Sequence, residues 1–216
     1  MESLGGIIGA GIGIGMLILL GFVYVLVMAL AVVSYVFSAL GIGGMMKSFG
    51  MPHPGCAFIP FYNTYLLGKV AEESSLRLGD SKVKPFGKIL LIMHIVTSAA
   101  SFLLGFGSGI AQIIQVLVTR SASSTSEISV PGIYFFLSML LIWIISIVIM
   151  IITIVYCVFF YIAVYKIYKC FVPKNAVLFL VLSIVFSVTA PFIFFFIRKK
   201  EPLSPVINLD DYTPEN

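Results

Sequence analysis

Residues 132–165 read GIYFFLSMLLIWIISIVIMIITIVYCVFFYIAVY and contain no charged side chain. As a single helix, this run of about 34 residues would be about 51 Å long, at 1.5 Å per residue. The hydrocarbon layer of a bilayer is only about 30 Å thick, so such a helix must tilt or project beyond it. The run therefore predicts a membrane-spanning helix.

The composition of the whole chain agrees with this prediction. Of the 216 residues, 60% are apolar and 10% are charged, whereas soluble domains are about half apolar and a quarter charged. We therefore expect one all-α membrane domain, a polytopic helical bundle over residues 1–200, in contact with the lipid bilayer. Residues 201–216 are rich in proline and acidic residues and are predicted to form a disordered tail.

Four segments are apolar over the roughly 20 residues that a transmembrane helix needs. They lie within residues 7–46, 89–118, 132–165 and 175–197. Three loops join these segments. The first and third loops hold most of the lysines and arginines, whereas the second loop holds Arg120 alone. The positive-inside rule predicts a multi-pass protein of the cell membrane with the first and third loops cytoplasmic and both termini outside. The basic cluster at residues 198–200, next to the fourth span, conflicts with an external tail.

The N-terminal segment contains glycines at helical spacing. Gly5, Gly9 and Gly13 are four residues apart, so on a helix they share a face and let another helix approach closely, as in a glycine zipper. The segment contains no GxGxxG fingerprint for a dinucleotide. We expect close packing within the fold, with homo-oligomerisation or a pore as the alternatives.

The second span carries a polar stripe at heptad spacing. Its positions are separated alternately by four and three residues, so they share one helix face. In lipid such a face is expected to turn toward another helix or toward water. Two roles are open for this face: hydrogen bonding to another helix, and lining a polar cavity. The stripe consists of His94, Ser98, Ser101, Gly105, Ser108, Gln112 and Gln115.

Residues 52–71, PHPGCAFIPFYNTYLLGKVA, interrupt the apolar pattern between the first and second spans. Pro52, Pro54 and Pro60 rule out a continuous helix. The segment is too short for a comfortable span and too apolar for a free loop, so it predicts a broken helix that is interfacial or re-entrant. We expect Tyr62 and Asn63 to bond the backbone groups that the break frees. Within this candidate motif we single out Pro60, Tyr62, Asn63, Tyr65 and Lys69.

This segment resembles the IP-[IF]-YN-x-Y … K-[IV]-A signature of small bacterial integral membrane proteins of unknown function. Similar segments are attached to some type I signal peptidases. The likeness covers roughly residues 35–105, and weakly the last span. The family usually has tryptophan where Gly55 or Cys56 stands here, and residues 120–165 match nothing in it. The resemblance implies a membrane location and a motif, but no chemistry.

Catalytic signatures are weak. Residues 72–77, EESSLR, fit the EExxxR motif of prenyl-protein-type membrane proteases, but His94 lacks the Asn or Asp that should follow four residues later. No HExxH is present, and all nine acidic residues lie outside the apolar runs. We expect a non-enzymatic scaffold or accessory protein that binds a lipid, a membrane-protein partner or a second copy of itself. A small transporter or pore lined by the polar stripe is the alternative, and the protease is third. No cofactor, metal ion or nucleic acid is expected.

Overall fold

The computed structural model describes residues 2–80, 82–122 and 131–204, and every regular element within these ranges is a helix. This confirms the predicted fold class, an all-α bundle of a multi-pass membrane protein. In chain order the elements are α1 (Glu2–Ser48), η1 (Pro54–Phe58), α2 (Tyr62–Arg77), α3 (Phe86–Ala122), α4 (Pro131–Phe171), η2 (Pro173–Asn175), α5 (Ala176–Val185) and α6 (Thr189–Ile197).

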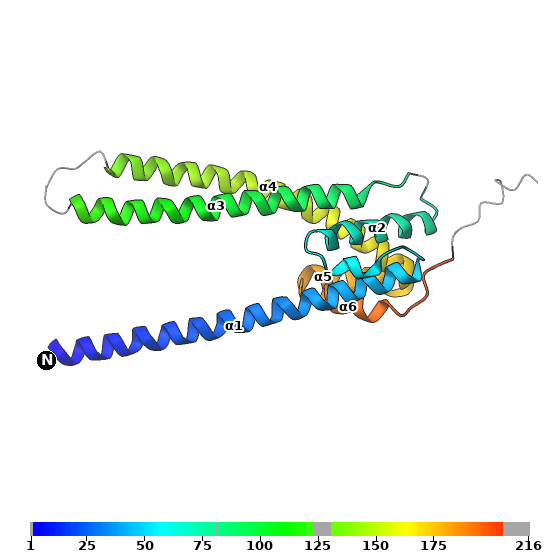
Figure 1. The fold of residues 1–216 in the computed structure, drawn as a ribbon, viewed down its shortest axis with the longest axis horizontal. Coiled ribbons are helices and arrows are strands. Elements are labelled where there is room, and N and C mark those ends of the chain that lie inside the picture. The colour runs from blue at the N-terminus through cyan, green and yellow to red at the C-terminus, as the bar shows by residue number, and fades with distance from the viewer. Residues whose placement is uncertain (1, 81, 123–130, 205–216) are drawn as a thin grey trace, which may run out of the picture.

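Three of these helices are long and apolar enough to cross a membrane. They contain the candidate spans Gly15–Ser48, Phe86–Ile114 and Phe136–Phe171. Figure 1 shows α1, α3 and α4 extending in the same direction from a compact end of the molecule. Each of the first three predicted spans therefore falls on a helix that is long and apolar enough to cross a membrane.

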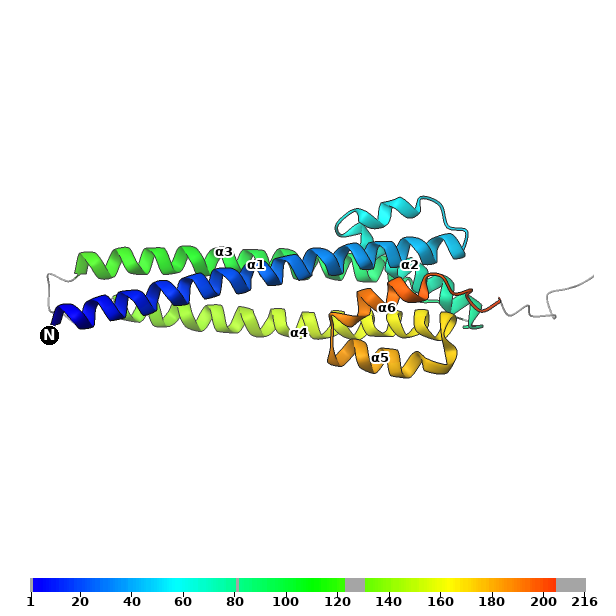
Figure 2. The same ribbon diagram turned by 90° about the horizontal axis from the view of Figure 1, so that it is seen from below.

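Residues 175–197, the predicted fourth span, do not form one continuous helix. The segment forms two short helices, α5 with 10 residues and α6 with 9, separated at residues 186–188. A helix of ten residues is about 15 Å long, half of the roughly 30 Å that a crossing requires. Helices α5 and α6 lie side by side against the compact end in both ribbon views (Figures 1 and 2). The segment therefore begins and ends at this end of the molecule.

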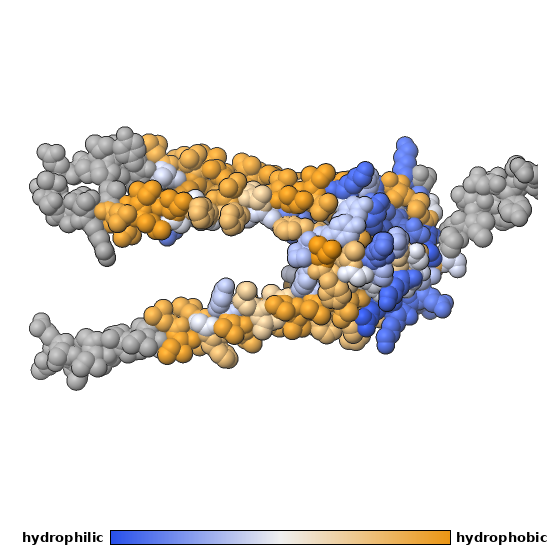
Figure 3. All heavy atoms as spheres, in the orientation of Figure 1, coloured by the Kyte–Doolittle hydropathy of each residue, from blue (hydrophilic) through white to orange (hydrophobic). Residues whose placement is uncertain are grey.

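The compact end, which we call the cap, comprises residues 35–80, 82–95 and 156–204. Every fully buried hydrophobic side chain of the described residues lies within it. Outside the cap, the long helices present apolar side chains on their surfaces, as Figure 3 shows. Lipid is the solvent that such surfaces require, because exposing them to water would forfeit the hydrophobic effect.

Glycines bring the helices of the cap into close contact. A Cβ added to Gly68 of α2 would lie 2.5 Å from the Cα atom of Gly87 in α3. A Cβ added to Gly41 of α1 would lie 2.6 Å from the Cβ atom of Phe194 in α6. The predicted packing glycines Gly5, Gly9 and Gly13 belong to α1 but lie outside the residues whose surroundings the structure describes.

The apolar part of α1 stands apart from the other long helices. Helix α1 packs against α6, η1 and α2, all within the cap, whereas α3 and α4 pack along each other. The space-filling view shows an open space between α1 and the α3–α4 pair (Figure 3). Residues 15–33 of α1 are exposed throughout.

Positive charge is concentrated at the cap. Every lysine and arginine lies there except Arg120, which stands near the far end of α3. The start of the tail also lies at the cap, because Leu203 N–H donates to Cys170 O at 3.0 Å and Arg77 Nη1 donates to Leu203 O at 3.4 Å. The start of the tail and the first residues of α1 therefore lie at opposite ends of the molecule (Figure 1), which differs from the expectation that both termini share one side. Residues 205–216 of the predicted disordered tail lie outside the described residues.

Candidate functional site

The chain reverses direction between α1 and α2, and two residues in this turn adopt unusual backbone conformations. His53 has φ 55° and Phe61 has φ 63°, the only non-glycine residues with positive φ among those described. Each such conformation costs about 1–3 kcal/mol and persists only where the surroundings enforce it. Pro54 begins η1, and Pro60 directly precedes Phe61. The predicted proline-broken helix is confirmed.

Two side chains bond the backbone of this turn. Asn63 Nδ2 donates to Ala57 O at 2.7 Å, as predicted for Asn63. Tyr35 of α1, which the sequence did not single out, donates its hydroxyl to Phe58 O at 2.8 Å. Tyr62 makes no such bond in the structure; its exposed ring lies 5.2 Å from that of Tyr65.

The Tyr35 contact shows how far the turn reaches along α1. Tyr35 lies 13 residues before Ser48, the last residue of α1, which corresponds to about 20 Å along the helix axis. Figure 2 shows the segment after α1 folding back beside this helix before α2 begins. The chain therefore folds back along α1, and we call this segment the first re-entrant turn after that course. Whether it lies at the interface or enters the bilayer stays a prediction.

The α5–α6 hairpin makes a second re-entrant turn beside the same part of α1. The ring of Phe37 lies 4.9 Å from that of Phe192 and 4.7 Å from that of Phe195. At the turn, Thr189 Oγ1 donates to Phe186 O at 2.7 Å, and Leu182 O lies 3.1 Å from the same hydroxyl. This hydroxyl ties the start of α6 to the last turn of α5.

A small cavity lies where the two re-entrant segments meet; we call it the inner cavity. Its volume is about 230 Å³. Its polar groups are hydroxyls and one amide, which suit water or a small neutral molecule that both donates and accepts hydrogen bonds. The lining residues are Ser38, Asn63, Thr64, Leu67, Phe160, Tyr161, Ser183, Ser187, Ala190, Pro191 and Phe194.

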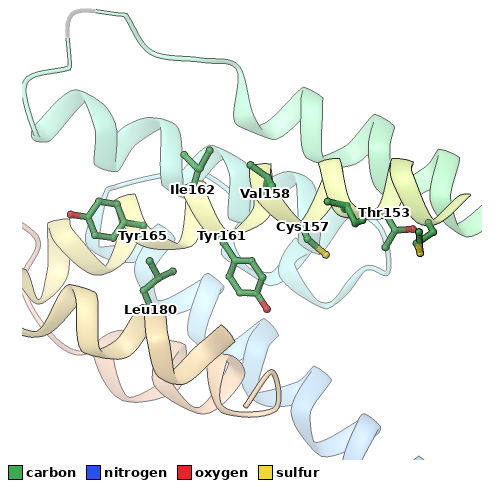
Figure 4. A pocket seen from close by; sticks show the side chains of 9 residues that line it. Thr153, Cys157, Val158, Tyr161, Ile162, Tyr165 and Leu180 are labelled. Carbon is green, nitrogen blue, oxygen red and sulfur yellow. The ribbon is translucent and has the colours of Figure 1, made fainter. Parts of the chain in front are cut away.

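A larger, open groove runs between α4 and α5; we call it the α4–α5 groove. Its volume is about 640 Å³ and its lining is almost wholly apolar. Figure 4 shows Tyr161 of α4 beside Leu180 of α5, whereas Ile162 lies on the side of α4 away from Leu180. The residues that line the groove are Met150, Thr153, Ile154, Cys157, Val158, Tyr161, Ile162, Tyr165 and Leu180.

The polar stripe of α3 is only partly covered. His94 packs between the rings of Phe61, at 5.3 Å, and Tyr156, at 5.7 Å, so the top of the stripe meets the first re-entrant turn. Farther along α3, Ser98 and Ser108 are half-buried, whereas Ser101, Gly105 and Gln112 are exposed. Ser108 Oγ donates to Gly105 O of its own helix at 2.9 Å. Gln115 lies outside the residues whose side chains the structure describes.

The remaining motif residue, Lys69, belongs to the α2–α3 junction. Lys69 Nζ pairs with Glu72 Oε2 at 2.7 Å, and Glu72 Oε1 accepts a hydrogen bond from Gly87 N–H at 2.8 Å. The bond to Glu72 raises the pKa of Lys69 above its ordinary value, although burial of the ammonium opposes this. Glu72 thereby holds the first turn of α3 against α2, where a carboxylate also complements the helix dipole.

The other residues of the EExxxR segment also make structural contacts. Glu73 Oε1 pairs with Arg77 Nε at 3.4 Å. The Arg77 guanidinium lies 4.7 Å from the centre of the Phe49 ring, and it reaches Leu203 O as described above. Within the described ranges, no group of three or more His, Cys, Asp and Glu side chains could hold a metal ion.

Fold and site together define a polytopic helical membrane protein in which two segments fold back at the basic end. Comparison of the chain with protein-family models, with curated proteins and with solved structures finds no match. The resemblance to the IP-[IF]-YN-x-Y proteins therefore stays a prediction.

The sequence did contain a signal for the second re-entrant turn. Ser187, Thr189 and Pro191 stand within ten residues in the middle of an apolar run. Hydroxyl side chains and proline together favour a break in a helix, because they offer the backbone other bonds and remove a donor. Tyr35 carried no comparable signal, since a tyrosine within a predicted span has many uses.

Proposed function

We propose that this chain is a non-enzymatic accessory protein of the cell membrane that binds an amphipathic lipid in the α4–α5 groove. The observation that carries the proposal is the size and apolar lining of this groove, about 640 Å³ along α4. Ligand sites of roughly 300–1,000 Å³ with apolar walls and a few polar groups are typical of small-molecule binding. Tyr161 and Tyr165 supply hydroxyls at the end of the groove nearest the basic residues.

The concentration of positive charge favours an orientation with the cap in the cytoplasm. The N-terminus and the α3–α4 connection would then be external, with the first and third loops and the tail internal. A groove on the outer side of α4 at this level faces the cytoplasmic leaflet, which brings lipid to it directly.

Blocking the groove tests the proposal. Val158→Trp places a bulky ring into the groove, whereas Val155→Trp makes the same change at an exposed position of α4 outside it. We expect native mass spectrometry of the detergent-purified protein to find bound lipid in the wild type and in Val155→Trp, and several-fold less in Val158→Trp. Equal lipid retention by both variants would contradict the proposal.

A small transporter is the second candidate, and the exposed part of the α3 stripe favours it. Ser101 and Gln112 lie on the apolar length of α3 and are exposed. Polar side chains at such positions mark water-filled paths more often than lipid contacts. A second wall, from α1 or from a second copy of the chain, would be needed to close a path.

Flux through proteoliposomes distinguishes the two candidates. The transporter predicts flux of a small polar solute that Gln112→Leu lowers, while Ile113→Leu, at an exposed apolar position beside it, leaves it unchanged. Absence of flux from the wild-type protein, together with retained lipid, favours the accessory protein.

A further inference from the structure

A third cavity, which we call the basic pocket, lies between the end of α2, the α2–α3 connection and α4. Its volume is about 360 Å³. Three lysines and one aspartate line it, together with Ser75 and Ile162; the charged residues are Asp80, Lys82, Lys84 and Lys166.

One of the three lysines is neutralised by the aspartate. Lys166 Nζ lies 2.5 Å from Asp80 Oδ2. Lys82 and Lys84 pair with no carboxylate of the described residues, and Lys84 Nζ stands 6.0 Å from the centre of the Phe159 ring. The pocket therefore carries two positive charges without a counter-ion, which attract an anion.

A second observation points to a ligand here. Ser75 is 1% exposed, and its hydroxyl is the one buried side-chain polar atom without a hydrogen-bond partner among the described residues. An unsatisfied buried polar group is costly and calls for an explanation, such as an acceptor supplied by a bound molecule. A phosphate oxygen is an acceptor that suits both a serine hydroxyl and lysine ammonium groups.

The basic pocket adjoins the α4–α5 groove, because Ile162 lines both cavities. A molecule with a phosphate in one and a hydrocarbon chain in the other is a phospholipid. We propose that the basic pocket binds the phosphate headgroup of an anionic phospholipid whose acyl chain occupies the α4–α5 groove. This inference rests on the proposed function and names the ligand class.

Removing the two unpaired charges tests the headgroup site. In Lys82→Gln/Lys84→Gln, we expect the preference for phosphatidic acid over phosphatidylcholine to fall by about thirtyfold, since each of the two basic residues near an anionic lipid contributes roughly 1 kcal/mol. The preference is measured by native mass spectrometry of the full-length protein. The matched control Lys174→Gln/Lys199→Gln removes the same charge from exposed positions elsewhere at the cap. It should change this preference less than twofold. An equal loss in both double variants would overturn the site, because general attraction to the basic end would then explain the binding.

Ser75→Ala tests the hydroxyl separately. Because this hydroxyl has no hydrogen-bond partner among the described residues, the variant should melt no lower than wild type when both are purified without lipid. It should nevertheless bind phosphatidic acid several-fold more weakly. Unchanged binding of phosphatidic acid would exclude Ser75 from the site.

Further outcomes of the lipid-binding experiment distinguish the groove proposal from the basic-pocket proposal, and a phospholipid ligand from a free anion. If the wild type retains no lipid, the groove proposal fails; if it retains lipid without any headgroup preference, the basic pocket alone fails. Displacement of phosphatidic acid by millimolar inorganic phosphate would identify free phosphate as the ligand and overturn the lipid assignment. Persistence of the lipid under that challenge supports it.

Discussion

Single side chains hold the first re-entrant turn in a conformation that the backbone alone disfavours. Two positive-φ residues, His53 and Phe61, strain the turn, and bonds from Tyr35 and Asn63 satisfy carbonyls on the segment between them. Where water is scarce, a carbonyl without a partner costs more than at a soluble surface. Asn63 therefore matters more than its half-buried position suggests.

Replacing Asn63 with leucine tests this role. Asn63→Leu keeps the approximate size of the side chain but leaves Ala57 O without its donor, so the free energy of unfolding should fall by about 1–3 kcal/mol. The measurement is the thermal melting temperature in detergent. Asn175→Leu is the matched control, because Asn175 is exposed and makes no capping bond at the start of α5. Equal melting temperatures for the two variants would show that the bond is dispensable.

Pairs of helices are positioned by close backbone approach and by charge. At the α2–α3 crossing, Gly68 and Gly87 leave no room for a side chain, and Glu72 bonds the Gly87 N–H. At the α1–α6 crossing, Gly41 meets Phe194 in the same way. These two crossings fix how the re-entrant segments sit against the long helices, and hence the shape of the inner cavity.

A methyl group at the α2–α3 crossing should force the helices apart. In Gly68→Ala the new Cβ would lie 2.5 Å from backbone atoms of Gly87, and overpacking of this kind costs about 1–3 kcal/mol or more. Gly105→Ala in α3 meets nothing within 4 Å and should be neutral, or stabilising by up to about 1 kcal/mol through helix propensity. Unfolding in detergent would compare the two. A Gly68→Ala protein as stable as wild type would contradict the tight crossing.

The molecule as a whole is polarised along its long axis. Apolar helices extend from one end, and all but one of the basic residues lie at the other (Figure 3). The first residues of α1 and the start of the tail lie at opposite ends of the molecule (Figure 1). Because residues 175–197 return to the cap, the basic cluster at residues 198–200 lies with the other basic residues of the cap. It therefore no longer conflicts with the expected cytoplasmic position of the first and third loops.

Cysteine accessibility tests this orientation. In a cysteine-free background, Ser124→Cys should react with a membrane-impermeant maleimide in intact cells, because the α3–α4 connection is expected outside. Lys199→Cys, at the start of the tail, should react only after permeabilisation. Labelling of Lys199→Cys in intact cells would restore the four-span topology.

Much of the fold could be predicted because it depends on local properties of the chain. The apolar run at residues 132–165 has few alternatives to a membrane helix, since the backbone must satisfy its own hydrogen bonds in lipid. Pro54 and Pro60 interrupt a helix wherever they occur, and Asn63 bonds a carbonyl only six residues away. For the same reason the bond of Asn63 could be expected without knowledge of the other helices.

The conformation of residues 175–197 depends on contacts with residues that are distant in the sequence. Residues 175–197 have the same hydropathy as one long helix or as two short ones, so composition does not distinguish a crossing from a hairpin. Contacts with Phe37 and Gly41 of α1, which are far away in the chain, accompany the hairpin form. The side on which the tail leaves follows from that packing. The basic pocket is of the same kind, because Ser75, Lys82, Lys84 and Lys166 come together only when α4 packs beside α2 and its following loop.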